Sequence, residues 1–253
     1  MPTKLAAQLY SVRHATKTPA DIATTLKKIR DIGYQAVQLS GLGPIDIKEL
    51  KAILDDNELI VCATHTSYDR MRDELDVVMD EHRLLGCPHL AIGGMPLAYR
   101  NGEGYHRFAK EASEVARRAA AAGFTWSYHN HSFELEKFDG KTGLSILFDE
   151  SDPSVFLSEL DTYWVQHGGA DPAQWISDLN GRIKLLHLKD MVIGQGKQLM
   201  AEVGEGNLNW PAILAAAAKS GVEWYIVEQD ECQRDPFESL AISLRNLQAM
   251  GLS

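Results

Sequence analysis

Histidines and carboxylates cluster in four short stretches of the second half of the chain. These stretches are the triplet His129-Asn130-His131, the pair Glu159 and Asp161, the pair His187 and Lys189, and Glu228. Each ionisable group is costly to bury unless it is paired or bound to an ion. If the stretches meet in the fold, they form a mixed nitrogen and oxygen site, which suits a divalent metal such as Mn²⁺, Co²⁺, Zn²⁺ or Mg²⁺. We therefore predict one divalent metal ion as the cofactor.

Taken singly, these residues also have ordinary structural interpretations. A lone buried histidine is more often hydrogen-bonded to the backbone than bound to a metal, and Asp161 could form a turn or cap a helix. In an extended segment, residues two apart share a face, so His129 and His131 can both point inward and either could bind the metal. One of them could instead be a general acid or base. Glu134 could orient one of these histidines or be solvated.

A recurring pattern shows which elements must position these groups. A segment with helical periodicity ends in glycine or asparagine, and a short apolar run follows within a few residues. The pattern occurs at Gly33, Asn57, Gly86, Gly123 and Gly221. Helices often end with a residue in the left-handed region, which glycine and, less readily, asparagine can adopt. We predict a helix-to-strand junction at each position.

Eight strands are predicted, with amphipathic helical segments between them. Their ranges are 4–10, 34–39, 59–64, 88–93, 124–129, 155–161, 183–188 and 223–228. Eight βα units in about 250 residues predict an α/β fold, a single (β/α)8 barrel domain over residues 1–253. A doubly wound open sheet is the alternative, but QLYSVRHAT follows the first strand in place of a GxGxxG turn. The longest irregular stretch, 189–210, is predicted to be a loop over the active face.

In such a barrel the catalytic groups lie at the carboxyl ends of the strands. Polar side chains do stand at these predicted ends, and the ionisable ones concentrate on the fifth to eighth strands. They are Gln8 and Arg13, Gln38, His65, His129 and His131, Glu159 and Asp161, His187 and Lys189, and Glu228. This joint placement favours a metal site over separate structural roles.

Composition excludes several classes of partner. The 25 Lys and Arg residues against 35 Asp and Glu residues give a net charge of −10, which repels the phosphates of nucleic acids. No segment reaches about 18 apolar residues, so we expect no membrane partner. The three cysteines Cys62, Cys87 and Cys232 are scattered, which fits a cytoplasmic protein. A homo-oligomer is compatible with the sequence.

Six stretches together resemble the sugar phosphate isomerase/epimerase superfamily of xylose isomerase-like TIM barrels, which includes ketose 3-epimerases, inosose dehydratase and endonuclease IV. They span nearly the whole chain: QLYSVR at 8–13, SYHNHSFEL at 127–135, ELDTYWV at 159–165, LLHLKD at 185–190, GEGNLNW at 204–210 and YIVEQD at 225–230. The resemblance implies a single metal ion and a small-molecule sugar or keto-sugar substrate.

The resemblance also implies a ligand set. Asp161, His187 and Glu228 match three of the four metal ligands of ketose epimerases, and His129 stands where those enzymes have a glutamate. Those epimerases remove and return a proton with two metal-bound glutamates. A histidine at the fifth strand leaves that relay incomplete. Inosose dehydratases and related lyases also carry a histidine-rich end of this strand, which makes elimination next to a ketone the alternative.

The implied activity is isomerisation or epimerisation of a sugar or sugar phosphate. The metal polarises a carbonyl and the adjacent hydroxyl, and a base takes the neighbouring proton. Glu228 or His131 is the candidate base, and Lys189 either stabilises an oxyanion, acts as an acid or forms an exposed salt bridge.

Four further residues are expected to bind substrate: Gln8, Arg13, His65 and Trp164. Trp164 and Tyr10 could stack on a sugar or belong to the core. Arg13 could bind a phosphate or carboxylate, or form a surface ion pair.

Three other functions are also considered. The first is a lyase or dehydratase that acts on a keto-sugar or keto-inositol. An endonuclease IV-like reaction is disfavoured by the negative net charge, and a non-catalytic sugar-binding barrel would not need a bound metal.

Overall fold

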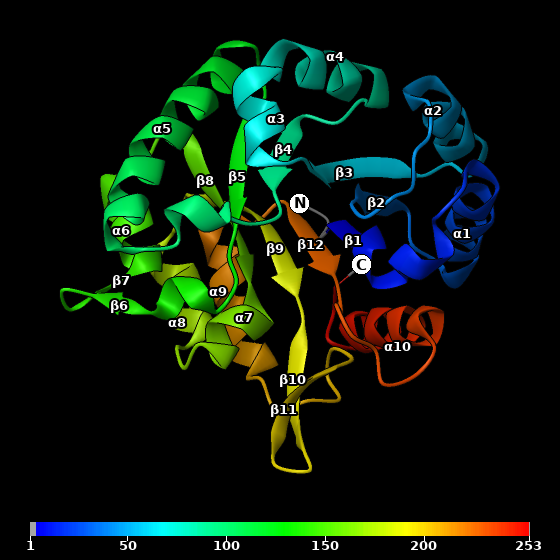
Figure 1. The fold of residues 1–253 in the computed structure, drawn as a ribbon. Helices are drawn as coiled ribbons and strands as arrows, with labels where there is room; N and C mark the ends of the chain where they lie inside the picture. The colour runs from blue at the N-terminus through cyan, green and yellow to red at the C-terminus, as the bar shows by residue number, and fades with distance from the viewer. Residues whose placement is uncertain (1–3, 253) are drawn as a thin grey trace.

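Eight parallel strands close into a barrel in the computed structural model, which describes residues 4–252 (Figure 1). Around the barrel the strand order is β1-β12-β9-β8-β5-β4-β3-β2. The strands are β1 (Lys4–Gln8), β2 (Ala36–Leu39), β3 (Ile60–His65), β4 (His89–Ile92), β5 (Thr125–His129), β8 (Phe156–Asp161), β9 (Ile183–Leu188) and β12 (Trp224–Val227). The predicted (β/α)8 barrel and its eight strands are confirmed.

Helices surround the barrel on its outer side (Figure 1). They are α1 (Pro19–Ile32), α2 (Ile47–Asp56), α3 (Tyr68–Asp73), α4 (Leu75–Leu85), α5 (Gly102–Ala121), α6 (Gly143–Glu150), α7 (Thr162–His167), α8 (Pro172–Asp178), α9 (Trp210–Ser220) and α10 (Pro236–Ala249), with 3₁₀ helices η1 (Leu9–Ala15), η2 (Leu97–Tyr99) and η3 (Phe133–Leu135). Local sequence explains where they begin. Thr18 and Asp21, for example, form a reciprocal capping box at the start of α1, and Pro19 occupies its first position. Within residues 4–252, no helix combines the length and apolarity needed to cross a membrane.

The predicted helix-to-strand junctions are correct at the four glycines, all of which have positive φ. The prediction is wrong in detail at Asn57, whose φ is −99°. The next residue, Glu58, takes the left-handed conformation with φ of 52°.

Two groups of buried residues form the core. The larger one lies between the strands and the helices. The smaller one comes from barrel strands alone, and most of its members are small: Ala6, Ala36, Cys62, Ala63, Ala91, Leu185, Trp224 and Ile226. Because side chains alternate across a strand, this smaller group identifies the positions that face the barrel interior.

Two sequence predictions need correction. The first strand ends at Gln8 and not at residue 10, because the Gln8 side chain accepts from the Tyr10 amide and starts η1. The stretch 189–210 is not irregular throughout: it contains the antiparallel hairpin of β10 (Asp190–Gly194) and β11 (Lys197–Ala201). A second short hairpin joins β6 (Lys137–Phe138) and β7 (Lys141–Thr142).

Candidate metal centre

Strand alternation directs the predicted metal ligands into the barrel. His187 lies two residues after Leu185, and Glu228 lies two residues after Ile226, both of which belong to the interior group. Tyr128 and Leu160 belong to the outer core, so the residues that follow them, His129 and Asp161, face inward. All four side chains therefore meet at the carboxyl ends of β5, β8, β9 and β12.

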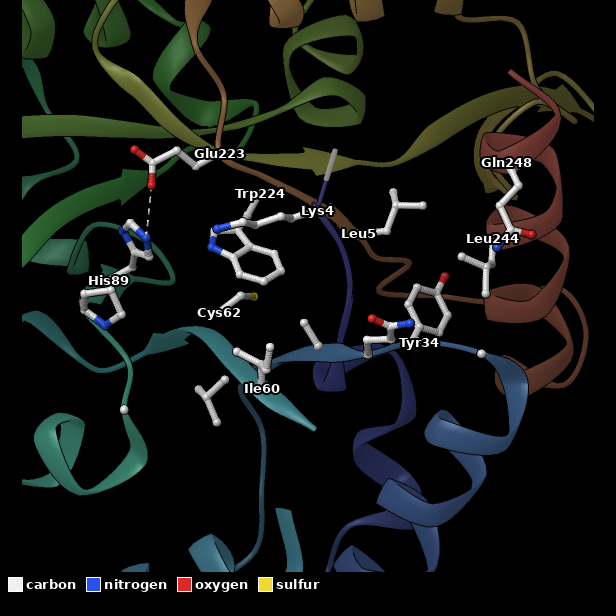
Figure 2. Close-up of a pocket in the computed structure, with 16 residues that line it drawn as sticks. Lys4, Leu5, Tyr34, Ile60, Cys62, His89, Glu223, Trp224, Leu244 and Gln248 are labelled. Carbon is white, nitrogen blue, oxygen red and sulfur yellow. Dashed lines mark ion pairs between the residues drawn. The ribbon is translucent and has the colours of Figure 1, made fainter. Parts of the chain in front are cut away.

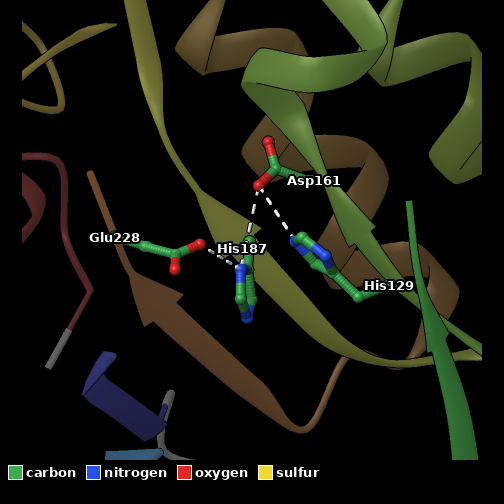
Figure 3. A group of neighbouring side chains, drawn as sticks. All are labelled: His129, Asp161, His187 and Glu228. Atoms are coloured by element: carbon green, nitrogen blue, oxygen red, sulfur yellow. Dashed lines mark hydrogen bonds and ion pairs between the residues drawn. The ribbon is translucent and has the colours of Figure 1, made fainter. Parts of the chain in front are cut away.

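The four side chains are close enough to share one ion (Figure 3). One donor atom from each residue lies within 4.8 Å of the others. His129 Nε2 is 3.2 Å from Asp161 Oδ2, and His187 Nδ1 is 2.8 Å from Glu228 Oε2. All four residues are buried. At the end of β5 it is His129, and not His131, that the structure brings into this four-donor cluster.

Lys189 contacts the same carboxylates. Its Nζ lies 2.9 Å from Asp161 Oδ2, 2.8 Å from Glu228 Oε2 and 2.7 Å from Asp230 Oδ2, and the side chain is fully buried. The exposed salt bridge considered for Lys189 is therefore wrong. Asp230 was not among the predicted site residues, although it lies in the YIVEQD stretch two residues after Glu228.

Mutual pairing keeps these buried groups charged. Burial alone would raise the pKa of Asp161, but Lys189, His129 and His187 together outweigh it and hold that pKa at about 2. Burial also opposes ionisation of Glu228, and Lys189 and His187 nevertheless hold its pKa well below the usual range. Burial disfavours the charged forms of Lys189 and His187, yet the carboxylates raise the pKa of Lys189 well above its usual value and that of His187 to about 10.

The donor set fits a divalent cation. Two imidazoles and two carboxylates are ligands that Mn²⁺, Co²⁺ and Zn²⁺ accept. Three carboxylates, Asp161, Glu228 and Asp230, contact the ammonium of Lys189, and a fourth, Glu159, lies 3.3 Å from His187 Nε2. The four carboxylates thus outnumber the two cations, Lys189 and protonated His187. This local excess of negative charge favours a cation at the cluster.

Glu159 lies beside the four-donor cluster and contacts Gln38, His65 and His187. It is fully buried, and both His65 Nε2 and Gln38 Nε2 lie 2.6 Å from its carboxylate oxygens. The predicted substrate-binding residue His65 is therefore held by Glu159. The role of Glu159 was missed, although its spacing of two residues from Asp161 already places both on one face of β8.

His131 and Trp164 stand next to the cluster. The His131 ring centre is 5.0 Å from that of His129 and 5.4 Å from that of Trp164. Within residues 4–252, His131 Nδ1 and Trp164 Nε1 are buried without a hydrogen-bond partner. Burial, and after it His129 and Lys189, lower the pKa of His131 to about 3, so the ring is neutral at physiological pH.

Glu134 orients the segment that carries His131. Its Oε2 accepts from the His131 amide at 2.9 Å, and the Tyr128 hydroxyl donates to its Oε1 at 2.6 Å. The residue is fully buried, so the solvated alternative is wrong. Burial raises the pKa of Glu134 to about 7.

Asp161 both caps a helix and faces the four-donor cluster, so its two predicted roles occur together. Its Oδ1 accepts from the Trp164 amide at 2.9 Å and caps α7, while Oδ2 faces His129 and Lys189. The Asn130 side chain accepts from the Asp161 amide at 3.0 Å. The helix cap therefore fixes the carboxylate that also faces the cluster.

No hydrogen bond or ion pair within residues 4–252 joins Gln8 or Arg13, the residues predicted on the first βα unit, to the four donors. Gln8 Oε1 accepts from the Tyr10 amide, and the buried Gln8 Nε2 has no partner within the described chain. Arg13 donates to the Tyr10 carbonyl at 2.9 Å, and its guanidinium lies 4.2 Å from the centre of the Tyr10 ring. The structure therefore packs Arg13 on Tyr10.

A cavity of about 700 Å³ lies at the opposite, amino-terminal end of the strands (Figure 2). It is lined by residues that include Lys4, Cys62, His89, Glu223 and Trp224. Its one carboxylate, Glu223, already has partners within the described residues: it lies 2.7 Å from Lys184 and 3.5 Å from His89. Because barrel enzymes place their chemistry at the carboxyl ends, the four-donor cluster remains the candidate active site.

Comparison with known proteins agrees with this architecture. The family described as "Xylose isomerase-like TIM barrel" matches residues 26–250. The rhizopine catabolism protein MocC of Rhizobium meliloti is 23% identical, over 89% of this chain and 80% of its own.

Two solved structures are similar over almost their whole length. A sugar phosphate isomerase/epimerase from Parabacteroides distasonis has a TM-score of 0.82 and 25% identity, over 99% of this chain and 95% of its own. The probable 3-DHS dehydratase AsbF of Bacillus anthracis has a TM-score of 0.74 and 14% identity, over 97% and 99% respectively.

Proposed function

The chain belongs to the xylose isomerase-like TIM barrel family, and on that premise we propose that it is a metal-dependent isomerase or epimerase of a sugar or sugar phosphate. The observation that carries the proposal is the four-donor cluster of His129, Asp161, His187 and Glu228. A divalent ion bound there would polarise a substrate carbonyl and its neighbouring hydroxyl, which acidifies the adjacent C–H group.

His131 is the first candidate for the base that takes this proton. Its ring is neutral at physiological pH, and Nδ1 is buried without a partner within residues 4–252. The Glu134 carboxylate holds the His131 backbone in place through the amide. A neutral imidazole whose nitrogen has no partner within residues 4–252 can accept a proton from a bound substrate, but a pKa of about 3 makes His131 a weak base, so the adjacent C–H group has to be strongly acidified.

Glu228 is the second candidate base. Its Oε2 is held by both Lys189 and His187, which stabilise the carboxylate and lower its basicity. Lys189 can in turn donate to a developing oxyanion, although each of its three contacts is now made with a carboxylate. The indole N–H of Trp164 has no hydrogen-bond partner in the described part of the chain, and this donor and the aromatic face suit a sugar.

A dehydratase or lyase acting on a keto-sugar or keto-inositol is the alternative function. The feature in its favour is His129, which by the sequence resemblance stands where ketose epimerases have a glutamate. A single base on one face of the substrate would favour elimination or one-base isomerisation over epimerisation.

Hydrogen exchange separates these activities. The protein, supplied with Mn²⁺ or Co²⁺, is incubated with keto-sugars and keto-inositols in D₂O. We expect deuterium to appear at the carbon next to the carbonyl, and loss of water if the reaction is an elimination. His131→Ala should slow the exchange by about 10²- to 10⁴-fold, the usual contribution of a general acid or base.

His106→Ala is the matched control, because His106 is exposed on α5 and pairs with Glu150. It should exchange at the wild-type rate. Reversible inversion at C3 of simple ketoses, at a rate indifferent to His131, would show that other residues carry the proton.

A further inference from the structure

Glu159 is a fully buried carboxylate that is not one of the four donors. Three nitrogen atoms approach it: Gln38 Nε2 and His65 Nε2, each at 2.6 Å, and His187 Nε2 at 3.3 Å. A buried carboxylate that three nitrogen donors approach is stabilised in its ionised form. An ionised carboxylate can only accept hydrogen bonds, so its neighbours must present N–H groups to it.

This requirement fixes the orientation of the Gln38 amide. The oxygen and nitrogen of an amide are assigned from their partners, and here Glu159 Oε1 demands the NH₂ group. The Gln38 oxygen then lies 2.7 Å from His187 Nε2. Because an amide oxygen only accepts, His187 Nε2 must carry a proton.

The other nitrogen of His187 faces the metal centre. Nδ1 lies 2.8 Å from Glu228 Oε2 and 3.7 Å from Asp161 Oδ2. With Nε2 protonated, Nδ1 is the nitrogen that can bind an ion. Metal-binding histidines commonly donate their second N–H to a carboxylate or carbonyl oxygen, which fixes the ring.

We infer that Glu159 and Gln38 are positioning residues that keep His187 Nε2 protonated and turn its Nδ1 toward the metal centre. The inference rests on the proposed function insofar as it concerns a bound ion. Glu159 acts through Gln38, whose amide it orients, and directly on the His187 ring.

A second ion provides the competing explanation of the same residues. Donor atoms of His65, Glu159 and His187 also lie within 4.8 Å of one another. An ion at these atoms would need His187 Nε2 without its proton. The hydrogen bond from Nε2 to the Gln38 oxygen therefore excludes this second ion. The inference predicts one bound ion per chain, and the competing explanation predicts two.

The test compares the wild type with Glu159→Gln, which keeps the size of the side chain and removes the obligatory acceptor. Glu202→Gln is the matched control, since Glu202 is a buried carboxylate that accepts from Ser239 and is not among the cluster residues. Two measurements are made on each protein. Nitrogen-15 spectra of the histidine-labelled protein loaded with Zn²⁺ report whether His187 Nε2 keeps its proton when an ion is bound, and competition with a chelator reports Co²⁺ affinity and stoichiometry.

We expect His187 Nε2 to be protonated in the wild type, with one Co²⁺ bound per chain. Glu159→Gln should lose about 10- to 100-fold in Co²⁺ affinity, the usual cost of removing such a partner. Glu202→Gln should keep the wild-type affinity.

An unprotonated Nε2, two bound Co²⁺ ions per chain, or a Glu159→Gln variant with wild-type affinity would each overturn the inference. A wild type that binds no Co²⁺ would contradict the proposed function instead. In that case nitrogen-15 spectra compare the metal-free wild type with Glu159→Gln, and a His187 ring that holds its Nε2 proton equally well in both would overturn the inference.

Discussion

Among the single residues of the site, Lys189 is the cation that keeps the neighbouring carboxylates ionised. Its ammonium joins Asp161, Glu228 and Asp230, and burial strengthens these attractions because little water screens them. The two carboxylates that would bind the ion are thereby kept ionised and in place before any ion arrives. Lys189 therefore serves to hold the carboxylates of the site in their ionised form.

Glu134 gives a pH-dependent prediction at this scale. Burial raises its pKa from 4.5 to about 7 in the folded protein. The folded state thus holds the proton more tightly than the unfolded chain, and stability falls as the pH rises from below 4.5 through 7. Once Glu134 is ionised, the loss should reach about 3 kcal/mol.

Glu134→Gln cannot ionise and isolates this contribution. We expect the wild type to lose more thermal stability than Glu134→Gln between about pH 5.5 and about pH 8.5, measured by thermal unfolding with chelator present. All other groups are common to the two proteins, so they cancel in the comparison. Parallel unfolding curves over this range would show that Glu134 does not change its ionisation.

The residue scale also shows what the sequence could and could not predict. The positions of His129, Asp161, His187 and Glu228 followed from strand ends, because barrel topology brings those ends together. Their partners did not follow. The contacts of Glu159 with His65 and Gln38 depend on how side chains from three strands meet. Neither residue spacing nor composition specifies these contacts.

At the scale of elements, the β10–β11 hairpin replaces the irregular loop that we expected. Gln195 and Gly196 both have positive φ, 51° and 75°, as the two central residues of a tight hairpin turn do. Asn-Gly and Asp-Gly are the familiar sequences for this turn, and glutamine at the first position conceals it. The flanking runs DMVIG and KQLMA are the two paired strands.

Asp190 anchors the base of this hairpin to the segment that follows it. Its buried carboxylate accepts hydrogen bonds from five N–H groups, which belong to Met191, Gly204, Gly206, Leu208 and Trp210. A Cβ at Gly206 would meet Asp190 Oδ1 at 2.3 Å, so only glycine allows this approach. The residues of the GEGNLNW stretch at 204–210 therefore serve to bind the Asp190 carboxylate.

Asp190→Asn should destabilise the protein. Whichever way the amide turns, its NH₂ group replaces an oxygen that accepts from at least two N–H groups, and buried donors without an acceptor cost about 1–3 kcal/mol each. The total cost of about 2–6 kcal/mol should lower the melting temperature of a chain of this length by roughly 5–20 °C. Thermal unfolding of the purified variant measures this directly.

Asp46→Asn is the control for this substitution. Asp46 caps α2 and accepts from the Lys48 and Glu49 amides, and asparagine caps helices equally well. Its melting temperature should match the wild type. An Asp190→Asn protein as stable as this control would show that the five contacts contribute little.

At the scale of the whole molecule, closure of the barrel is what creates the site. Four strands that are far apart in sequence each contribute one donor, and β12 lies between β9 and β1 so that Glu228 meets His187. The repeating helix, glycine and strand pattern was sufficient to predict this architecture, because each unit is encoded locally. The cavity at the amino-terminal end could not be predicted, since it depends on how side chains fill the barrel floor.

The most direct test of the proposed function is the metal content of the protein and of one ligand variant. Elemental analysis follows mild purification and is repeated after addition of Mn²⁺ or Co²⁺ and removal of excess ion. Glu228→Gln removes one donor charge, and Glu202→Gln serves again as the buried control. We predict about one ion per chain in the wild type and the control, and a large loss of bound ion in Glu228→Gln. A Glu228→Gln protein with unchanged metal content and unchanged activity would contradict the proposed metal centre.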